Sequence, residues 1–286
     1  MMNSDSRFKA LELIKGAYDL HIHTSPSHYE RSLDDFELVK EATALGMSGV
    51  LIKNHFESTS ARAALVNRQM KGGAKLYGSI TLNLSVGGIN PYAVESAVRL
   101  GAKMVWMPTK DSQNHINQAG IGDFRSREGL TVFNDDGSLK TCVYEVMEVA
   151  HKYNVCVSTG HLTPEESFSV CKAGLDLGVQ MILTHPEFSY TTIPLEIQLK
   201  FSDMGVIIEK DWVNIALDMT TSKEMAKSIK FIGAENIYLA TDRGQASGER
   251  PSEGMLMYIE SMLNYGITPE EIRTMIYIVP KAVLGE

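Results

Sequence analysis

The sequence predicts an α/β protein with the fold of a (β/α)8 TIM barrel, and two observations support this. Eight short apolar segments recur along the 286 residues, and segments with helical character separate them. The short segments are apolar on both faces, which is typical of parallel strands covered by helices. Eight alternating units match one barrel of this length, and a doubly wound open sheet is the second choice.

The predicted strands are short runs of apolar and β-branched residues. In chain order they are residues 17–23, 49–55, 75–83, 102–109, 155–161, 180–186, 205–212 and 237–242. Parallel neighbours need a crossover connection, so a helix is expected between consecutive strands.

Cap residues indicate where several of these helices begin. Residues 32–35 (SLDD) resemble a capping box, and Asn90 stands before Pro91 as a cap before a first-turn proline. Residues 163–166 and 268–271, both TPEE, are capping boxes with proline at the first helical position. Glycine in a left-handed conformation is expected to end the helices at Gly46, Gly101, Gly178, Gly205, Gly233 and Gly266.

Nothing in the sequence divides the chain, so residues 1–286 are expected to form a single domain. The longest irregular stretch is residues 109–140, after the fourth strand. A loop of that length in a compact fold is usually functional, and we interpret it as a lid insertion. Within it, Asp136-Gly137 between alternating runs predicts a small hairpin.

The composition excludes several classes of protein. A net charge of −8 without clustered Lys and Arg argues against a nucleic-acid partner. No run of about 18 apolar residues occurs, so no membrane span is expected. The three cysteines lack a CxxC spacing, which is typical of a reducing compartment, and we expect a cytoplasmic protein. The expected partner is a small-molecule substrate, and homo-oligomer formation is left open.

Polar side chains collect at the ends of the predicted strands, the face on which TIM barrels carry their active sites. Five of the eight histidines end a strand, namely His21, His23, His55, His161 and His185. His21 and His23 stand two apart on one strand, so both rings face the same side. Asp242 ends the eighth strand, which neighbours the first when a barrel closes.

These side chains predict a metal site, because neutral imidazole is a ligand for Zn²⁺ and similar ions. A single His-x-His pair could be a hydrogen-bonded core pair, but five converging groups favour a metal. The predicted ligands are His21, His23, His161, His185 and Asp242. One or two divalent ions are expected, with Zn²⁺ first and Mn²⁺, Fe²⁺ or Ni²⁺ as alternatives.

The same residues resemble the amidohydrolase superfamily of metal-dependent hydrolases. The resembling segments are 19–23 (DLHIH), 160–161 (GH), 184–186 (THP), 240–242 (ATD) and the C-terminal segment 267–285. The resemblance implies a (β/α)8 barrel in which His21, His23 and Asp242 hold a first metal. His161 and His185 would hold a second one, or serve as ligand and water-orienting group around a single ion.

The sequence departs from the superfamily pattern at the fourth strand. Many binuclear members carry a carboxylated lysine there that bridges the metals, but this strand ends in Met107-Pro108-Thr109. Lys53 on the second strand is either another bridging ligand or an ammonium group that binds an anionic substrate. His55, two residues later, shares these alternatives.

The expected function is metal-dependent hydrolysis, in which activated water attacks the carbonyl of a small anionic amide, lactone or ester. Asp242 is the expected base, and His185 is expected to help polarise the substrate oxygen. Predicted substrate contacts are Lys53, His55, Arg31, Asn83 and His115, together with Arg125 and Arg127 of the lid.

Three other functions are compatible with parts of this pattern. A metal-dependent decarboxylase or isomerase can use the same ligands on the same barrel. A phosphoesterase can also begin with His-x-His, but it normally ends in Asp-x-His, whereas this chain has Asp242-Arg243-Gly244. A non-catalytic metal-binding protein is disfavoured, because it has no need of Asp242 as a base.

Overall fold

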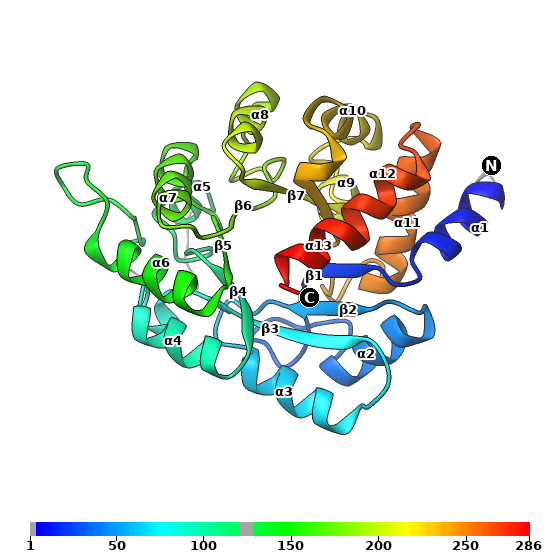
Figure 1. Cartoon of the computed structure of the whole chain (residues 1–286), viewed down its shortest axis with the longest axis horizontal. Helices are drawn as coiled ribbons and strands as arrows, with labels where there is room; N and C mark the ends of the chain where they lie inside the picture. The colour runs from blue at the N-terminus through cyan, green and yellow to red at the C-terminus, as the bar shows by residue number, and fades with distance from the viewer. Residues whose placement is uncertain (1–3, 120–127) are drawn as a thin grey trace.

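The computed structural model describes residues 4–119 and 128–286, and eight parallel strands form one sheet in it (Figure 1). The strands pair in sequence order from β1 to β8. They are β1 (Tyr18–Ile22), β2 (Gly49–Ile52), β3 (Lys75–Thr81), β4 (Ala102–Trp106), β5 (Cys156–Ser158), β6 (Met181–Leu183), β7 (Ile207–Asp211) and β8 (Ile237–Ala240). Each lies within its predicted run.

The sheet closes because β8 lies beside β1. The backbone N–H of Asp242 donates to His21 O at 2.8 Å, and that of His23 donates to Arg243 O at 2.9 Å. Ile22 and Arg243 form a parallel bridge between these two segments. The predicted (β/α)8 barrel is therefore confirmed.

Helices precede the first strand, separate consecutive strands on the outside of the barrel and follow the last strand (Figure 1). They are α1 (Ser4–Leu13), α2 (Asp35–Ala44), α3 (Ser60–Gln69), α4 (Pro91–Arg99), α5 (Gln113–Ala119), α6 (Thr141–Tyr153), α7 (Pro164–Asp176), α8 (Leu195–Asp203), α9 (Trp212–Ala216), α10 (Ser222–Ile232), α11 (Pro251–Asn264), α12 (Pro269–Arg273) and α13 (Val279–Val283). Two 3₁₀ turns, η1 (Leu84–Val86) and η2 (Ala234–Asn236), and a π-helical turn, η3 (Thr274–Ile278), complete the elements.

The predicted caps at Asn90, Thr163 and Thr268 are confirmed, but the first capping box is displaced. It consists of Asp34 and Glu37 rather than residues 32–35. Asp34 has the extended backbone that a cap requires, whereas Asp35 already belongs to α2 and is buried.

Two apolar cores fill the molecule, one between the strands and the outer helices and one inside the barrel. The inner core extends from the amino ends of the strands, where Tyr18 begins β1, to Trp106 at the end of β4, and it includes Val279 and Val283 of α13. The C-terminal helix thus closes the amino end, and Figure 1 shows α13 close to β1 at the centre of the molecule. The carboxyl ends of the strands are left for polar side chains.

Residues 109–140 contain α5 and the predicted hairpin. Phe133 and Leu139 form an antiparallel bridge, and Gly137 has a φ of 81°. The predicted contacts Arg125 and Arg127 lie outside the described residues, so the lid stays a prediction. No helix in the described part of the chain is long and apolar enough to cross a membrane.

Candidate metal centre

A cavity of about 540 Å³ opens at the carboxyl ends of the strands. It is lined by eight of the predicted site residues: His23, Arg31, Lys53, His55, His115, His161, His185 and Asp242. His21 lies at this end of β1 and is fully buried. The structure therefore brings side chains from distant parts of the sequence to one place.

His21 contacts acidic groups through both ring nitrogens. Its Nε2 lies 3.2 Å from Asp242 Oδ1 and 3.1 Å from Lys53 Nζ. Its Nδ1 lies 3.1 Å from Glu209 Oε1, and a carboxylate accepts hydrogen bonds, so we assign the hydrogen to Nδ1. This tautomer leaves the Nε2 lone pair directed towards Asp242, as a metal ligand requires.

The first group of potential ligands consists of His21, His23 and Asp242. His23 Nε2 lies 3.0 Å from Asp242 Oδ1, and the ligand atoms of the three residues all lie within 4.8 Å of one another. This is the set that the superfamily resemblance implied for a first metal.

Strand β7 contributes two carboxylates, Glu209 and Asp211, that were absent from the predicted ligand set. They form two further groups of potential ligands, His21–Glu209–Asp211 and His185–Asp211–Asp242. The alternation rule that identified His21 and His23 applies equally to Glu209 and Asp211, which stand two apart on one strand. That signal was available in the sequence.

His161 lies in the cavity wall but belongs to none of these groups in the described part of the chain. Its Nδ1 lies 3.0 Å from Nδ1 of His115, and its ring centroid lies 5.0 Å from that of His185. Its role as a metal ligand therefore stays a prediction.

Asn83 does not line the cavity, although it was predicted to contact substrate. Its amide donates to Thr109 Oγ1 at 2.8 Å and to the backbone oxygen of His55 at 3.0 Å. Thr109 Oγ1 in turn lies 2.8 Å from His55 Nδ1. Because these bonds occupy its amide, we interpret Asn83 as a residue that orients His55.

The comparisons with known proteins place the chain in a family. The model of a family of unknown function, DUF6282, matches residues 16–209, which is more than half of the chain. This chain belongs to that family. Among curated proteins, none matches the sequence.

Solved structures share the fold of this DUF6282 chain at low sequence identity. An amidohydrolase from Pseudomonas aeruginosa has a TM-score of 0.66 at 14% identity, covering 98% of this chain and 99% of its own. A protein assigned as a 2-pyrone-4,6-dicarboxylic acid hydrolase from Pseudomonas putida has a TM-score of 0.61 at 13% identity, covering 94% and 97%. An organophosphorus hydrolase from Deinococcus radiodurans has a TM-score of 0.58 at 13% identity, covering 96% and 94%. The predicted resemblance to the amidohydrolase superfamily is thus confirmed in the fold.

In this DUF6282 chain, burial favours the neutral form of five histidines at the cavity. It lowers the pKa of His21 to about 3 and that of His185 to about 4. Burial also lowers the pKa values of His23, His55 and His161 well below the usual value. Neutral imidazole is the form that binds metals, so the rings are ready to act as ligands.

Acidic groups outnumber basic ones beneath the cavity. Asp19, Glu209, Asp211 and Asp242 are all buried, and the ammonium group of Lys53 lies among them. Burial raises the pKa of Asp211 well above its usual value, and the neighbouring Glu209 acts in the same direction. Burial lowers the pKa of Lys53, against the opposing effect of Asp242.

Several buried polar atoms of the potential ligand groups lack a hydrogen-bond partner within the described residues. They are both carboxylate oxygens of Asp211, Oδ1 of Asp242 and Nδ1 of His23. Buried polar groups are normally paired, because each unpaired one costs about 1–3 kcal/mol, and more if charged. A divalent cation would satisfy the oxygens and offset their charge, so the residues present fit a metal.

Two of the potential ligands have a strained backbone. His185 has a φ of 24° and Asp242 a φ of 47°, both in the left-handed region. Non-glycine residues rarely adopt such angles, and those that do cluster at functional sites.

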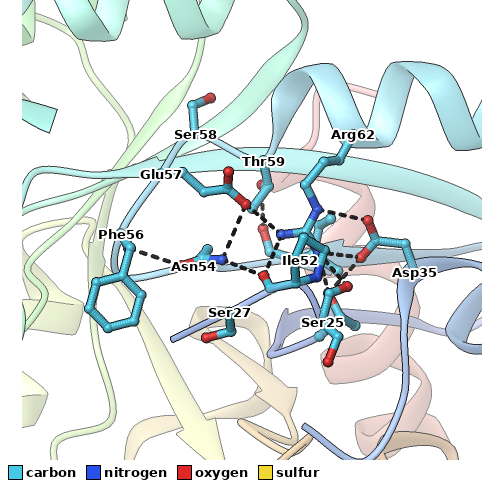
Figure 2. Close-up of polar contacts among 12 residues, drawn as sticks. Ser25, Ser27, Asp35, Ile52, Asn54, Phe56, Glu57, Ser58, Thr59 and Arg62 are labelled. Carbon is cyan, nitrogen blue, oxygen red and sulfur yellow. Dashed lines mark hydrogen bonds and ion pairs between the residues drawn. The ribbon is translucent and has the colours of Figure 1, made fainter. Parts of the chain in front are cut away.

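Arg62 of α3 fixes the chain that follows His23 (Figure 2). Its guanidinium donates to Asp35 Oδ1 at 2.7 Å, to the backbone oxygen of Ser25 at 2.9 Å and to Glu57 Oε1 at 2.7 Å. These bonds join the loop after β1 to the loop after β2. The network therefore supports the loop that follows the ligand strand β1.

Proposed function

We propose that this protein is a metal-dependent hydrolase that acts on a small anionic ester, lactone or amide. The observation that carries the proposal is the His21–His23–Asp242 group, in which Asp242 Oδ1 lies beside both imidazoles but forms no hydrogen bond within the described residues. The hydrolase names of the structural neighbours are consistent with it. Zn²⁺ is the first candidate because nitrogen ligands suit it, although the carboxylates would also suit Mn²⁺.

A divalent ion at this site would lower the pKa of water and polarise the substrate carbonyl. Asp242 lines the cavity, so its carboxylate is placed to take the proton of the attacking water and return it to the leaving group. Thr191 donates its hydroxyl hydrogen to the backbone oxygen of His185, so its oxygen accepts from His185 Nδ1 at 3.1 Å. His185 Nε2 is then left without a hydrogen and suits a ligand role better than donation to substrate.

The cavity wall supports an anionic substrate. Arg31 lines the cavity, and its Nε lacks a hydrogen-bond partner within the described residues. Lys110 lies 3.9 Å from the ring centre of Tyr29, and the guanidinium of Arg31 lies 5.8 Å from the same centre. Two cations on one wall favour a carboxylate, which an Arg fork can bind through two hydrogen bonds.

The test is turnover of a panel of carboxylate-bearing lactones and esters in ¹⁸O-labelled water, with Zn²⁺- or Mn²⁺-loaded protein. We expect solvent oxygen in the product, and loss of turnover after chelation. Asp242→Asn should reduce kcat about 10²–10⁴-fold, the usual contribution of a general base. Asp203→Asn, at an exposed position of α8, is the matched control. Unlabelled product or an unchanged kcat in Asp242→Asn contradicts the proposal, and unlabelled product favours a decarboxylase or isomerase.

A further inference from the structure

We propose that Asp211 of β7 is a metal ligand, and that His185, Asp211 and Asp242 together bind a second divalent cation. This cation would lie beside the one on His21, His23 and Asp242, with Asp242 shared between them. The inference rests on the metal site of the proposed function. It adds a ligand from a strand that neither the predicted site nor the superfamily resemblance assigns.

The first argument is the geometry of three successive strands. His185 follows β6, Asp211 ends β7 and Asp242 follows β8, and their ligand atoms all lie within 4.8 Å of one another. Asp211 pairs with Ala240 in the β7–β8 register, and Ala240 stands two residues before Asp242. The barrel itself therefore brings the three side chains together.

The second argument is the state of the Asp211 carboxylate. It is fully buried, and no N–H or neutral O–H group of the described residues donates a hydrogen bond to either oxygen; its polar neighbours include the carboxyl group of Glu209, which contacts it directly, and His21 Nδ1 at 3.5 Å. Asp211 is not needed to orient the His21 ring, because Glu209 already does so. Glu209 lies 3.1 Å from His21 Nδ1, whereas Asp211 lies 3.5 Å from it. A buried carboxylate without a donor is costly, and a cation is the partner that such a group requires.

The third argument is that β4 supplies no such ligand. Trp106 at its end fills the barrel interior, and Met107 packs in the outer core. The ammonium group of Lys110 lies over the ring of Tyr29. The β4 lysine that the superfamily resemblance implies is therefore missing here, and the carboxylate that joins His185 and Asp242 comes from β7.

The test is Mn²⁺ binding by three proteins, which are the wild type, Asp211→Asn and Asp19→Asn. Asp19 is the matched control, because it is a buried carboxylate of the same region but belongs to no ligand group among the described residues. After removal of free Mn²⁺, metal analysis should give two ions per chain for the wild type and Asp19→Asn, and one for Asp211→Asn. Electron paramagnetic resonance should show coupled ions in the first two and an isolated ion in the third.

Two Mn²⁺ ions retained by Asp211→Asn, or one bound by the wild type, would overturn the inference. Circular dichroism checks that Asp211→Asn folds. If it does not fold, anomalous scattering from Mn²⁺-soaked wild-type crystals decides, since no peak beside Asp211 refutes the ligand. A wild type that binds one ion and still hydrolyses refutes this inference alone. Two bound ions without hydrolysis refute the proposed function alone.

Discussion

Burial determines the charge of single residues at the barrel mouth, and Asp19 illustrates how. Its Oδ2 accepts from Thr241 Oγ1 at 2.6 Å, and its Oδ1 accepts from the backbone of Thr241 at 3.1 Å and of His21 at 3.3 Å. These bonds lower the pKa of Asp19, but burial outweighs them and raises it to about 7. The folded state therefore disfavours the ionised form.

This shift predicts a pH-dependent difference between wild type and Asp19→Asn in the absence of metal. A pKa raised from about 3.9 to about 7 means that the favourable contribution of Asp19 to the unfolding free energy is full below about pH 4. It is lost progressively as the pH rises through 7. The unfolding free energy of the wild type relative to Asp19→Asn should fall by a few kcal/mol over this range, at about 1.4 kcal/mol per unit.

Denaturant titrations at pH 4–8 measure this difference, and Asn can replace each hydrogen bond of Asp19. Asp203→Asn, at an exposed site, controls for the general effect of losing one carboxylate. A difference that does not change with pH would contradict the raised pKa of Asp19.

The sequence identified those site residues whose position follows from strand alternation. His21 and His23 face one point because they stand two apart, and Asp242 joins them because β8 closes on β1. Asp211 was not predicted, although it stands two residues after Glu209 and the alternation rule places both on one face. Its burial depends on β6 and β8, so only the assembled barrel shows that its oxygens lack donors.

At the scale of elements, the contact between β8 and β1 depends on one glycine. Gly244 has a φ of 121°, and a Cβ there would lie 1.7 Å from His23 O. Gly101, at the end of α4, has a φ of 98° with nothing within 4 Å of its Cβ position. The two positions share the backbone penalty of a left-handed conformation and differ in the clash.

Gly101→Ala should lower the unfolding free energy by about 1–2 kcal/mol, the cost of a left-handed L-residue. Gly244→Ala should lower it by about 1–3 kcal/mol more, because the backbone must shift to admit the methyl group. That shift moves Asp242 away from His23, so metal affinity should fall in Gly244→Ala only. Denaturant unfolding and Mn²⁺ titration measure the two effects. Equal Mn²⁺ affinities in both variants would contradict the claim that Gly244 is needed for the close contact between β8 and β1.

Element boundaries show where sequence reasoning stops. All eight strands lie within their predicted runs, because apolar runs and glycines mark them, but most runs continue past the strand into the loop. The capping box of α2 was displaced by two residues, since SLDD offers three acceptors and tertiary contacts select one. Arg62 bonds Asp35 from another helix, a contact that no local pattern contains.

For the whole molecule, the two ends of the barrel have opposite character. The amino end is closed by α13 and an apolar core, whereas the carboxyl end holds the buried carboxylates and histidines. The apolar packing at the amino end thus stabilises the fold, whereas the burial of incompletely paired charge at the carboxyl end destabilises it. A cation that binds at the carboxyl end should therefore stabilise the entire fold.

Metal binding should raise the midpoint of thermal unfolding. At a free Mn²⁺ concentration of about 1,000 times Kd, the folded state gains about 4 kcal/mol. In a chain of this size this corresponds to roughly 8 °C, and the shift should grow with the logarithm of Mn²⁺ concentration. The double variant His21→Ala/His23→Ala should show a clearly smaller shift, because only the group on His185, Asp211 and Asp242 remains, whereas His151→Ala, an exposed position of α6, should keep the full shift. An equal shift in the double variant would mean that His21 and His23 do not hold a stabilising ion.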